Sequence, residues 1–269
     1  MLSHKTIQKL LQILRVFMSY QQLKRTKFNN KCKMRKIVLF VVLLIFQIIN
    51  KANAQSIESL IKELPPYFSI LTTWGTRPEW DEKSENIYFL NKLVGDVFKI
   101  NIKTKEVSQV TAGFYHGGIQ RVLCLPNGDL LLAMGTNIFD ATNPEKDRHT
   151  GLGLYILTKD KPNSPFPLNV VCEEGPAVSK NSMKIAWTLV GQREIKMGEI
   201  FYENGVPKLK DEHTIISYKD SSAYVRLETQ DFRPPLNEEL IYTHYWGDEK
   251  DQYYNSQVFG FNLKTKKTT

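Results

Sequence analysis

Short apolar runs recur along the chain in one pattern of polar and apolar positions. One polar or charged residue precedes three apolar ones in "NIYF" (86–89), "DLLL" (129–132), "KIAW" (184–187) and "ELIY" (239–242). Each run follows a stretch rich in turn formers, and successive runs begin 43, 55 and 55 residues apart. Short apolar runs bounded by turn formers are typical of β-strands, so we expect one strand at each run.

A second element follows each apolar run. "DVFKINIKTK" (96–105) returns as "QVFGFNLKTK" (257–266), with weaker copies in "GLYILTKD" (153–160) and "GEIFYENG" (198–205). Their alternating apolar positions and their Lys-Thr-Lys or Asn-Gly turns predict β-hairpins. Two elements that recur four times in the same order indicate four copies of one small sheet. Such a sheet cannot bury both faces alone, so we predict an all-β fold, a β-propeller of four-stranded blades.

The segments around these repeats complete the predicted organisation. Residues 55–75 are expected to supply a short helix in "SIESLIKEL" (56–64) and an extended strand in "YFSILTTW" (67–74) that closes the ring. Residues 76–269 form the propeller, and the polar stretch 135–151 fits an insertion at a blade tip.

The N-terminal segment carries the positive charge of the chain. The formal net charge is +8, but residues 1–54 contain 11 Lys and Arg and no Asp or Glu, which leaves −3 for the remainder. "KMRK" (33–36), the apolar run 37–49 and "ANA" (52–54) are typical of a signal peptide cleaved after Ala54. We therefore expect an exported protein of the bacterial periplasm or a secreted one, with no nucleic-acid partner.

Two features of this segment leave alternatives open. An uncleaved run 37–49 would anchor the chain to the membrane, although it is shorter than the roughly 20 residues of a spanning helix. Translation could start at Met1, with an amphipathic leader, or at Met34, which would give a signal peptide of ordinary length.

The first repeat also resembles a known family. "RPEWDEKSENIYFLN" and "GDVFKINIKTKEVSQVT" are similar to the TolB-like, WD40-like propeller repeat, and the likeness extends with weaker matches from Arg77 to Thr269. The resemblance implies six or seven blades, so we expect four blades of a larger ring that continues after Thr269. A ring closed by four blades is the alternative. The match in the first repeat is carried by Pro78, Trp80, Asp81, Tyr88, Phe89, Asp96, Val97, Thr104 and Thr111.

The sequence contains few signals of chemistry. No Gly-x-Ser-x-Gly motif is present, and the histidines after the leader (116, 149, 213 and 244) do not have metal-ligand spacing. We therefore predict no catalytic residue, no cofactor and no metal ligand. Cys124 and Cys172 could form a disulfide or remain buried thiols.

In a propeller, loops and strand ends bring together residues that are distant in the sequence. We therefore look for candidate ligand-facing residues in predicted loops and near predicted strand ends. His116 precedes an inner strand, and "YTHYWG" offers His244, Tyr245 and Trp246. Exposed aromatic rings bind sugar faces and protein hot spots alike. Trp80 and Trp187 are expected to pack between blades. The other aromatic residues predicted near strand ends are Trp74, Tyr224, Tyr242, Tyr253 and Tyr254.

These observations favour an exported, non-catalytic propeller that binds an envelope or extracellular protein, or a glycan. One alternative is the substrate-gating propeller of a serine hydrolase similar to prolyl oligopeptidase, whose catalytic domain would follow Thr269. A second alternative is a propeller lyase with a metal on its axis. The sequence does not determine the ligand or the oligomeric state.

Overall fold

The computed structural model describes residues 65–135, 143, 152–173, 175–221, 224–248, 250 and 255–269. The chain divides into two compact units, Met1–Ile70 and Leu71–Thr269, and the fold described below is that of the second. The signal segment, the helix expected at 56–64 and nearly all of the insertion 135–151 lie outside the described residues. Within the described ranges, no helix is long and apolar enough to cross a membrane.

Four antiparallel sheets make up the described part of this unit, and in each the strands are neighbours in chain order. The first sheet holds β1 (Thr76–Trp80), β2 (Asn86–Leu90), β3 (Val97–Asn101) and β4 (Val107–Gln109). The second holds β5 (Ile119–Cys124), β6 (Leu130–Gly135), β7 (Leu152–Leu157) and β8 (Phe166–Cys172). The third holds β9 (Ala177–Val178), β10 (Lys184–Thr188), β11 (Glu194–Glu203) and β12 (Val206–Ser217). The fourth holds β13 (Tyr224–Phe232), β14 (Glu239–Gly247) and β15 (Asn255–Asn262).

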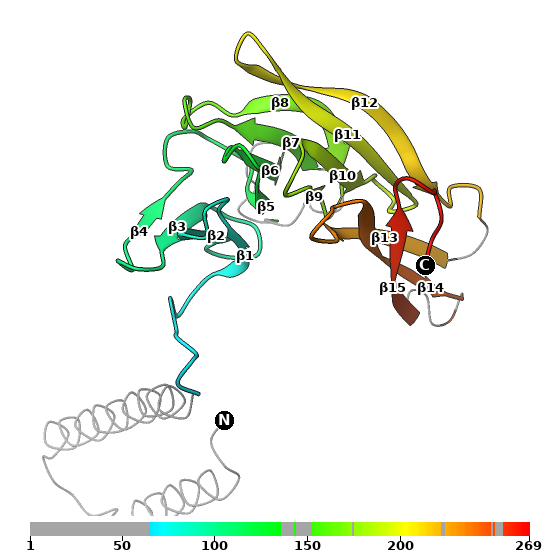
Figure 1. Ribbon diagram of the computed structural model, residues 1–269, viewed down its shortest axis with the longest axis horizontal. Helices are drawn as coiled ribbons and strands as arrows, with labels where there is room; N and C mark the ends of the chain where they lie inside the picture. Colours follow the sequence, from blue (N-terminus) through cyan, green and yellow to red (C-terminus); the bar gives the residue numbers. More distant parts are fainter. Residues whose placement is uncertain are drawn as a thin grey trace, which may run out of the picture. The chain divides into compact units, whose positions relative to one another are not determined.

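The repeat pattern of the sequence coincides with this architecture. The three apolar residues of every run lie in the second strand of a sheet, and every hairpin element has its first apolar residues in the third strand. Figure 1 shows the sheets following one another in chain order, from cyan through green and yellow to red. Their first strands are in contact in the same order, β1 with β5, β5 with β9 and β9 with β13. The prediction of an all-β propeller built from blades is confirmed.

Three apolar clusters fill the spaces between consecutive sheets, and one rule describes which residues enter them. Tyr88 of the first sheet packs with Leu130 and Leu132 of the second. The same relationship joins Leu131 to Ile185 and Trp187, and Ala186 to Leu240 and Tyr242. In the runs of the second, third and fourth sheets, the second and fourth residues therefore face the preceding sheet. In the runs of the first, second and third sheets, the third residue faces the following sheet. This division follows from the alternation of side chains along a strand.

The Lys-Thr-Lys turn is the same structure at both ends of the unit. Asn101 Oδ1 accepts hydrogen bonds from the backbone N–H groups of Lys103 and Thr104, each at 3.0 Å. Asn262 Oδ1 accepts the equivalent bonds from residues 264 and 265. Lys105 closes its turn with a φ of 62°, and Lys266 does so with 58°. The two hairpins therefore share their geometry as well as their sequence.

Three expectations are corrected or resolved. Residues 67–74 form no strand, because β1 begins at Thr76 and most of the preceding residues are exposed. Trp187 is completely buried between blades as expected, but Trp80 is 50% exposed, since it lies opposite Ile87 on the side of the first sheet that faces away from the second. Cys124 and Cys172 are both free and buried, so they do not form a disulfide. Beyond β15, Thr268 pairs with Phe261 as an isolated bridge.

Candidate functional site

A cleft of about 620 Å³ lies where the first strands of the sheets end, and we call it the axial cleft. The C-terminal end of β1, the turn after it and the end of β5 form one part of its wall. Lys180, which follows β9, and Asp231 of β13 complete it, so all four sheets contribute. The lining residues are Glu79, Trp80, Asp81, Glu82, Ser84, Cys124, Leu125, Pro126, Lys180 and Asp231.

Two glutamates of the cleft are held by lysines from other sheets. Glu79 Oε1 accepts hydrogen bonds from Lys180 Nζ and from the backbone N–H of Cys124. Glu82 Oε1 lies 2.8 Å from the ammonium of Lys159, in the turn between β7 and β8. The hydrogen bond and positive charge of Lys159 lower the pKa of Glu82. These pairs tie the first sheet to the second and third.

Asp81 has a mainly structural task at the base of the turn after β1. Its Oδ1 accepts the backbone N–H of Glu85 at 2.8 Å, and its Oδ2 accepts the side-chain amide of Asn86 at 2.7 Å. Burial opposes ionisation of Asp81, but these hydrogen bonds outweigh it and lower the pKa of the carboxyl group. The turn is thereby fixed with an ionised carboxylate, and it holds Glu82 at the cleft.

Cys124 is the one thiol among the described residues that line this cleft, and its surroundings suppress its reactivity. The side chain is 2% exposed, and its Sγ donates weakly to Glu82 Oε2 at 3.6 Å. Burial, aided by the nearby charge of Glu82, raises the pKa of the thiol to about 12. Because the thiolate is the nucleophilic form, Cys124 is inert at neutral pH.

The charge of the cleft is negative. Four carboxylates, Glu79, Asp81, Glu82 and Asp231, face one lining ammonium, that of Lys180. Desolvation raises the pKa of Asp231, while the N–H of Phe232 and the charge of Lys180 act against it. Trp80 adds an exposed aromatic face beside these charges. Chemically, the cleft offers carboxylates that attract cations or accept from hydroxyl groups, donors in Lys180 and Ser84, and an aromatic surface for stacking.

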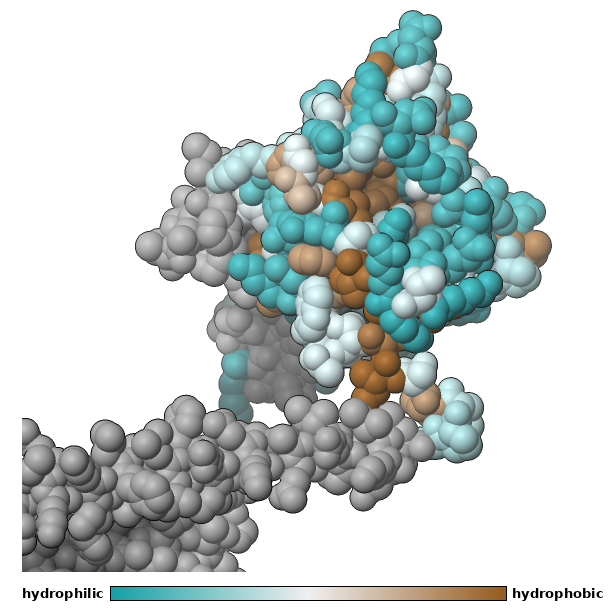
Figure 2. Space-filling view, turned by 90° about the vertical axis from the view of Figure 1, so that its left-hand side faces the viewer, coloured by the Kyte–Doolittle hydropathy of each residue, from teal (hydrophilic) through white to brown (hydrophobic). Residues whose placement is uncertain are grey.

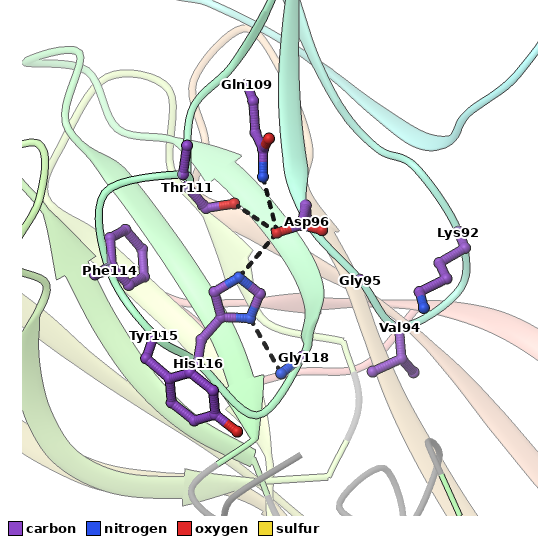
Figure 3. A pocket seen from close by; sticks show the side chains of 11 residues that line it. Lys92, Val94, Gly95, Asp96, Gln109, Thr111, Phe114, Tyr115, His116 and Gly118 are labelled. Carbon is purple, nitrogen blue, oxygen red and sulfur yellow. Dashed lines mark hydrogen bonds and ion pairs between the residues drawn. The ribbon is translucent and has the colours of Figure 1, made fainter. Parts of the chain in front are cut away.

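His116 lies in a separate pocket of about 360 Å³ between two loops of the first sheet (Figure 3). The loop between β2 and β3 supplies Asp96, and the loop from β4 to β5 supplies His116. Asp96 Oδ1 accepts from Gln109 Nε2 at 3.1 Å and from the hydroxyl of Thr111 at 3.4 Å. His116 Nε2 lies 3.2 Å from the same oxygen.

The second ring nitrogen of His116 fixes its tautomer. The backbone N–H of Gly118 donates to Nδ1 at 3.1 Å, so Nδ1 acts as an acceptor and Nε2 carries the proton donated to Asp96. Both nitrogens are therefore engaged in holding the two loops together. His116 lines a pocket, as a ligand-facing residue would, but binding through a ring nitrogen would require it to give up one of these bonds.

The other three candidate residues do not share one surface. His244 and Trp246 point to the face of β14 that also carries Tyr242, and Tyr245 points to the opposite face, as alternation along a strand requires. The His244 ring packs against Tyr218 and Trp246 at centroid distances of 4.9 and 5.7 Å. Desolvation lowers its pKa.

Tyr245 has a polar environment of its own. Its hydroxyl donates to Glu228 Oε2 at 2.9 Å, and the guanidinium of Arg226 lies 4.7 Å from the centre of its ring. Both partners come from the neighbouring strand β13. Tyr245 and the pair His244 and Trp246 therefore belong to different sites, and their role in ligand binding stays a prediction.

The remaining aromatic residues and histidines divide by burial. Tyr242 is 1% exposed and belongs to the cluster between the third and fourth sheets, so it is not open to a ligand. Trp74 packs edge-on against Phe89 and Phe98 and is 43% exposed. His213 lies on β12 away from both pockets. Tyr253, Tyr254 and His149 lie outside the described residues.

No group of three or more His, Cys, Asp or Glu side chains that could hold a metal ion occurs among the residues that the structure describes. The sequence reasoning missed the axial cleft, whose charged residues come from strand ends and turns of three different repeats. One signal for it was available. The charged pair "DE" (81–82) directly follows the first strand, at the position where turns of a propeller approach the axis.

Comparisons with known proteins add little beyond this geometry. No family model and no curated protein matches the chain. Among solved structures, it is similar to an oligogalacturonate lyase in complex with manganese, at 7% identity over 71% of this chain and a TM-score of 0.47. It is also similar to TolB from Acinetobacter baumannii, at 12% identity over 66% of the chain and a TM-score of 0.40.

A third likeness is to an auxiliary nutrient binding protein from Bacteroides ovatus, at 14% identity over 73% of the chain and a TM-score of 0.45. The chain spans 51%, 43% and 40% of the lengths of these three proteins, in the order given. With TM-scores below 0.5, the description of this chain as a β-propeller rests on its own four sheets.

Proposed function

We propose that this chain is an exported, non-catalytic β-propeller that binds a protein or glycan partner in the axial cleft. The observation that carries the proposal is the composition of the cleft. All four sheets contribute to it, and the half-exposed ring of Trp80 lies beside carboxylates and the ammonium of Lys180. A volume of about 620 Å³ is in the range of pockets that bind ligands in proteins.

The charge of the cleft selects among partners. Carboxylates accept hydrogen bonds from sugar hydroxyls and pair with lysine or arginine side chains, whereas they repel an acidic chain. The Trp80 ring offers a face for stacking on a sugar or for a hydrophobic contact with a peptide. A neutral glycan or a basic protein segment therefore fits the cleft, and an acidic polymer does not.

The reactive groups of the cleft support binding rather than catalysis. The Cys124 thiol is held in its protonated form. Among the described residues that line the cleft there is no histidine, so none could act as the base that activates the hydroxyl of Ser84. Export is supported by the N-terminal segment, because cleavage after Ala54 would release a chain that begins at Gln55. N-terminal sequencing of the expressed protein tests that part of the proposal.

The binding experiment compares three probes on the full chain in mild detergent: a lysine-rich peptide, a glutamate-rich peptide and a neutral hexasaccharide. Titrations followed by calorimetry should show binding of the lysine-rich peptide or of the sugar, but not of the glutamate-rich peptide. Trp80→Ala should weaken this binding at least about tenfold, the scale of a contact worth 1.4 kcal/mol.

Trp74→Ala is the matched control, since Trp74 is similarly exposed but does not line the cleft. The proposal fails if neither favoured probe binds, or if Trp80→Ala binds as well as the unchanged chain. Equal weakening by the two substitutions would also contradict it, because the effect would then not be specific to the cleft.

A further inference from the structure

One of the four turns that follow the first strands differs from the others in composition. The turns after β1, β5 and β9 are mainly polar: "DEKSE" (81–85), "PNGD" (126–129) and "SKNSM" (179–183). The turn after β13, "RPPLNE" (233–238), instead has Pro234, Pro235 and Leu236 at its centre, and all three are exposed. We call these three residues the apolar ridge.

The exposure of the apolar ridge is unusual for this chain. On the side that Figure 2 shows, where β3 and β4 lie in Figure 1, most of the surface is hydrophilic. Leu236 is 67% exposed and belongs to none of the three apolar clusters between the sheets. Proline is a common turn former, but leucine is not. The packing of the sheets therefore does not account for a leucine at this position.

Hydrogen bonds from the third sheet hold the backbone of the apolar ridge in place. Asn181 Nδ2 donates to the carbonyl oxygen of Leu236 at 2.9 Å. The backbone N–H of Lys180 donates to Asn237 Oδ1, also at 2.9 Å. Asn237 Nδ2 donates in turn to the carbonyl oxygen of Pro235 at 3.1 Å, and Asn237 is 7% exposed. A surface that is already fixed loses little conformational entropy when a partner binds to it.

Lys180 also connects the apolar ridge to the axial cleft. Its backbone N–H bonds to Asn237, the residue after Leu236, and its ammonium pairs with Glu79 inside the cleft. Asp231, which lines the cleft, belongs to the strand that leads into the ridge. The carboxylates of the cleft and the apolar side chains of the ridge are therefore neighbours on one surface.

We propose that the partner of the axial cleft is a protein segment that carries a lysine or arginine within a few residues of a large apolar side chain, and that Leu236 selects this segment. The inference rests on the proposed function and narrows the class of partner. The basic side chain pairs with the carboxylates of the cleft, and the apolar side chain is buried against the ridge. A glycan has no aliphatic side chain of this kind and would leave Leu236 exposed.

Two peptides that differ at one position test the proposal in calorimetric titrations against the full chain in mild detergent. Both carry two lysines, and beside them the first peptide has leucine where the second has serine. The leucine peptide should bind at least about tenfold more tightly. Leu236→Ser should abolish this difference by weakening the binding of the leucine peptide alone. Val190→Ser is the matched control, because Val190 is 49% exposed in the turn between β10 and β11 and does not line the cleft.

The outcomes separate this inference from the proposed function. If both peptides bind equally well and Trp80→Ala weakens both, the proposed function holds and the role of Leu236 is overturned. If the neutral hexasaccharide binds and neither peptide does, the proposed function again holds, and a protein segment as partner is overturned. If none of the three probes binds, both proposals fail. Equal weakening of the two peptides by Leu236→Ser, in a variant whose circular dichroism matches the unchanged chain, would also overturn the inference.

Discussion

His116 and Asp96 belong to different loops, and Nε2 of the histidine lies 3.2 Å from Oδ1 of the aspartate. That oxygen also accepts bonds from Gln109 and Thr111, so one carboxylate joins three side chains from β4 and the loop after it. The arrangement fixes the approach of the chain to β5, the first strand of the next blade.

Asp96→Ala should destabilise the fold, because it leaves three donors without their acceptor. We expect the free energy of unfolding to fall by about 1–3 kcal/mol. Asp96→Asn retains an oxygen acceptor and should cost less. Chemical denaturation measures both variants, with Asp220→Ala in an exposed turn as the control. Equal stability of the Asp96→Ala and Asp220→Ala variants would contradict a structural role for the carboxylate.

Alkaline pH should destabilise the protein through Cys124. Its pKa is raised from 9.0 to about 12 in the folded chain, so between these values the unfolded chain ionises while the folded chain does not. Stability is fully present below pH 9 and decreases above it by about 1.4 kcal/mol per pH unit from this group. Unfolding of the unchanged chain and of Cys124→Ala, measured across this range, should show a shallower slope for the variant. Identical slopes would exclude the thiol as the source.

The two tryptophans of the repeats should differ in their contribution to stability. Trp187 is fully buried between the second and third sheets, and Trp187→Ala should lower the free energy of unfolding by about 3–5 kcal/mol. Trp80 is half exposed, and Trp80→Ala should cost well under half of that. Urea denaturation measures the free energy of unfolding of both variants. A comparable decrease in the two variants would mean that Trp80 is buried in solution.

The shared turn predicts a matched pair of variants. Asn262→Ala removes two hydrogen bonds to the backbone and should cost about 1 kcal/mol, as should Asn101→Ala. Aspartate at either position keeps the accepting oxygen and should restore most of the loss. The midpoint of thermal unfolding reports both effects. Asn255→Ala, at an exposed end of β15, serves as the control.

Lys180 offers a way to separate the two classes of partner proposed for the axial cleft. Lys180→Met removes the ammonium that pairs with Glu79 and makes the cleft more negative. A basic peptide should then bind more tightly, whereas a neutral sugar loses a donor and should bind more weakly. Calorimetric titration with both probes gives the answer. A substitution that changes neither affinity would place the binding site elsewhere.

The sequence allowed the blades to be predicted because their strands are short apolar runs buried on both sides. A strand that is buried on both faces is apolar at successive positions, so the apolar run alone indicates the strand. The hairpins are indicated by the turns in which Asn101 and Asn262 accept backbone hydrogen bonds. The exposure of Trp80 could not be read in this way, because it depends on whether a neighbouring sheet is present on one side.

The candidate sites were less accessible to sequence reasoning. Residues 244–246 are adjacent in the chain, but alternation along β14 separates Tyr245 from its neighbours. The axial cleft draws Glu79, Lys180 and Asp231 from three different repeats, and no spacing within one repeat reveals that they meet. The distances between these three residues are set by how the sheets pack on one another.

The rule that assigns each apolar residue to the preceding or following sheet has a consequence for how this chain can change. Insertion of a single residue within a run such as 184–187 would exchange the two faces of its blade and bring mismatched surfaces together. Gain or loss of one complete repeat, 43 or 55 residues here, leaves every remaining face opposite a complementary one. We therefore expect insertion of one residue within such a run to disrupt the fold, whereas gain or loss of a whole blade should be tolerated.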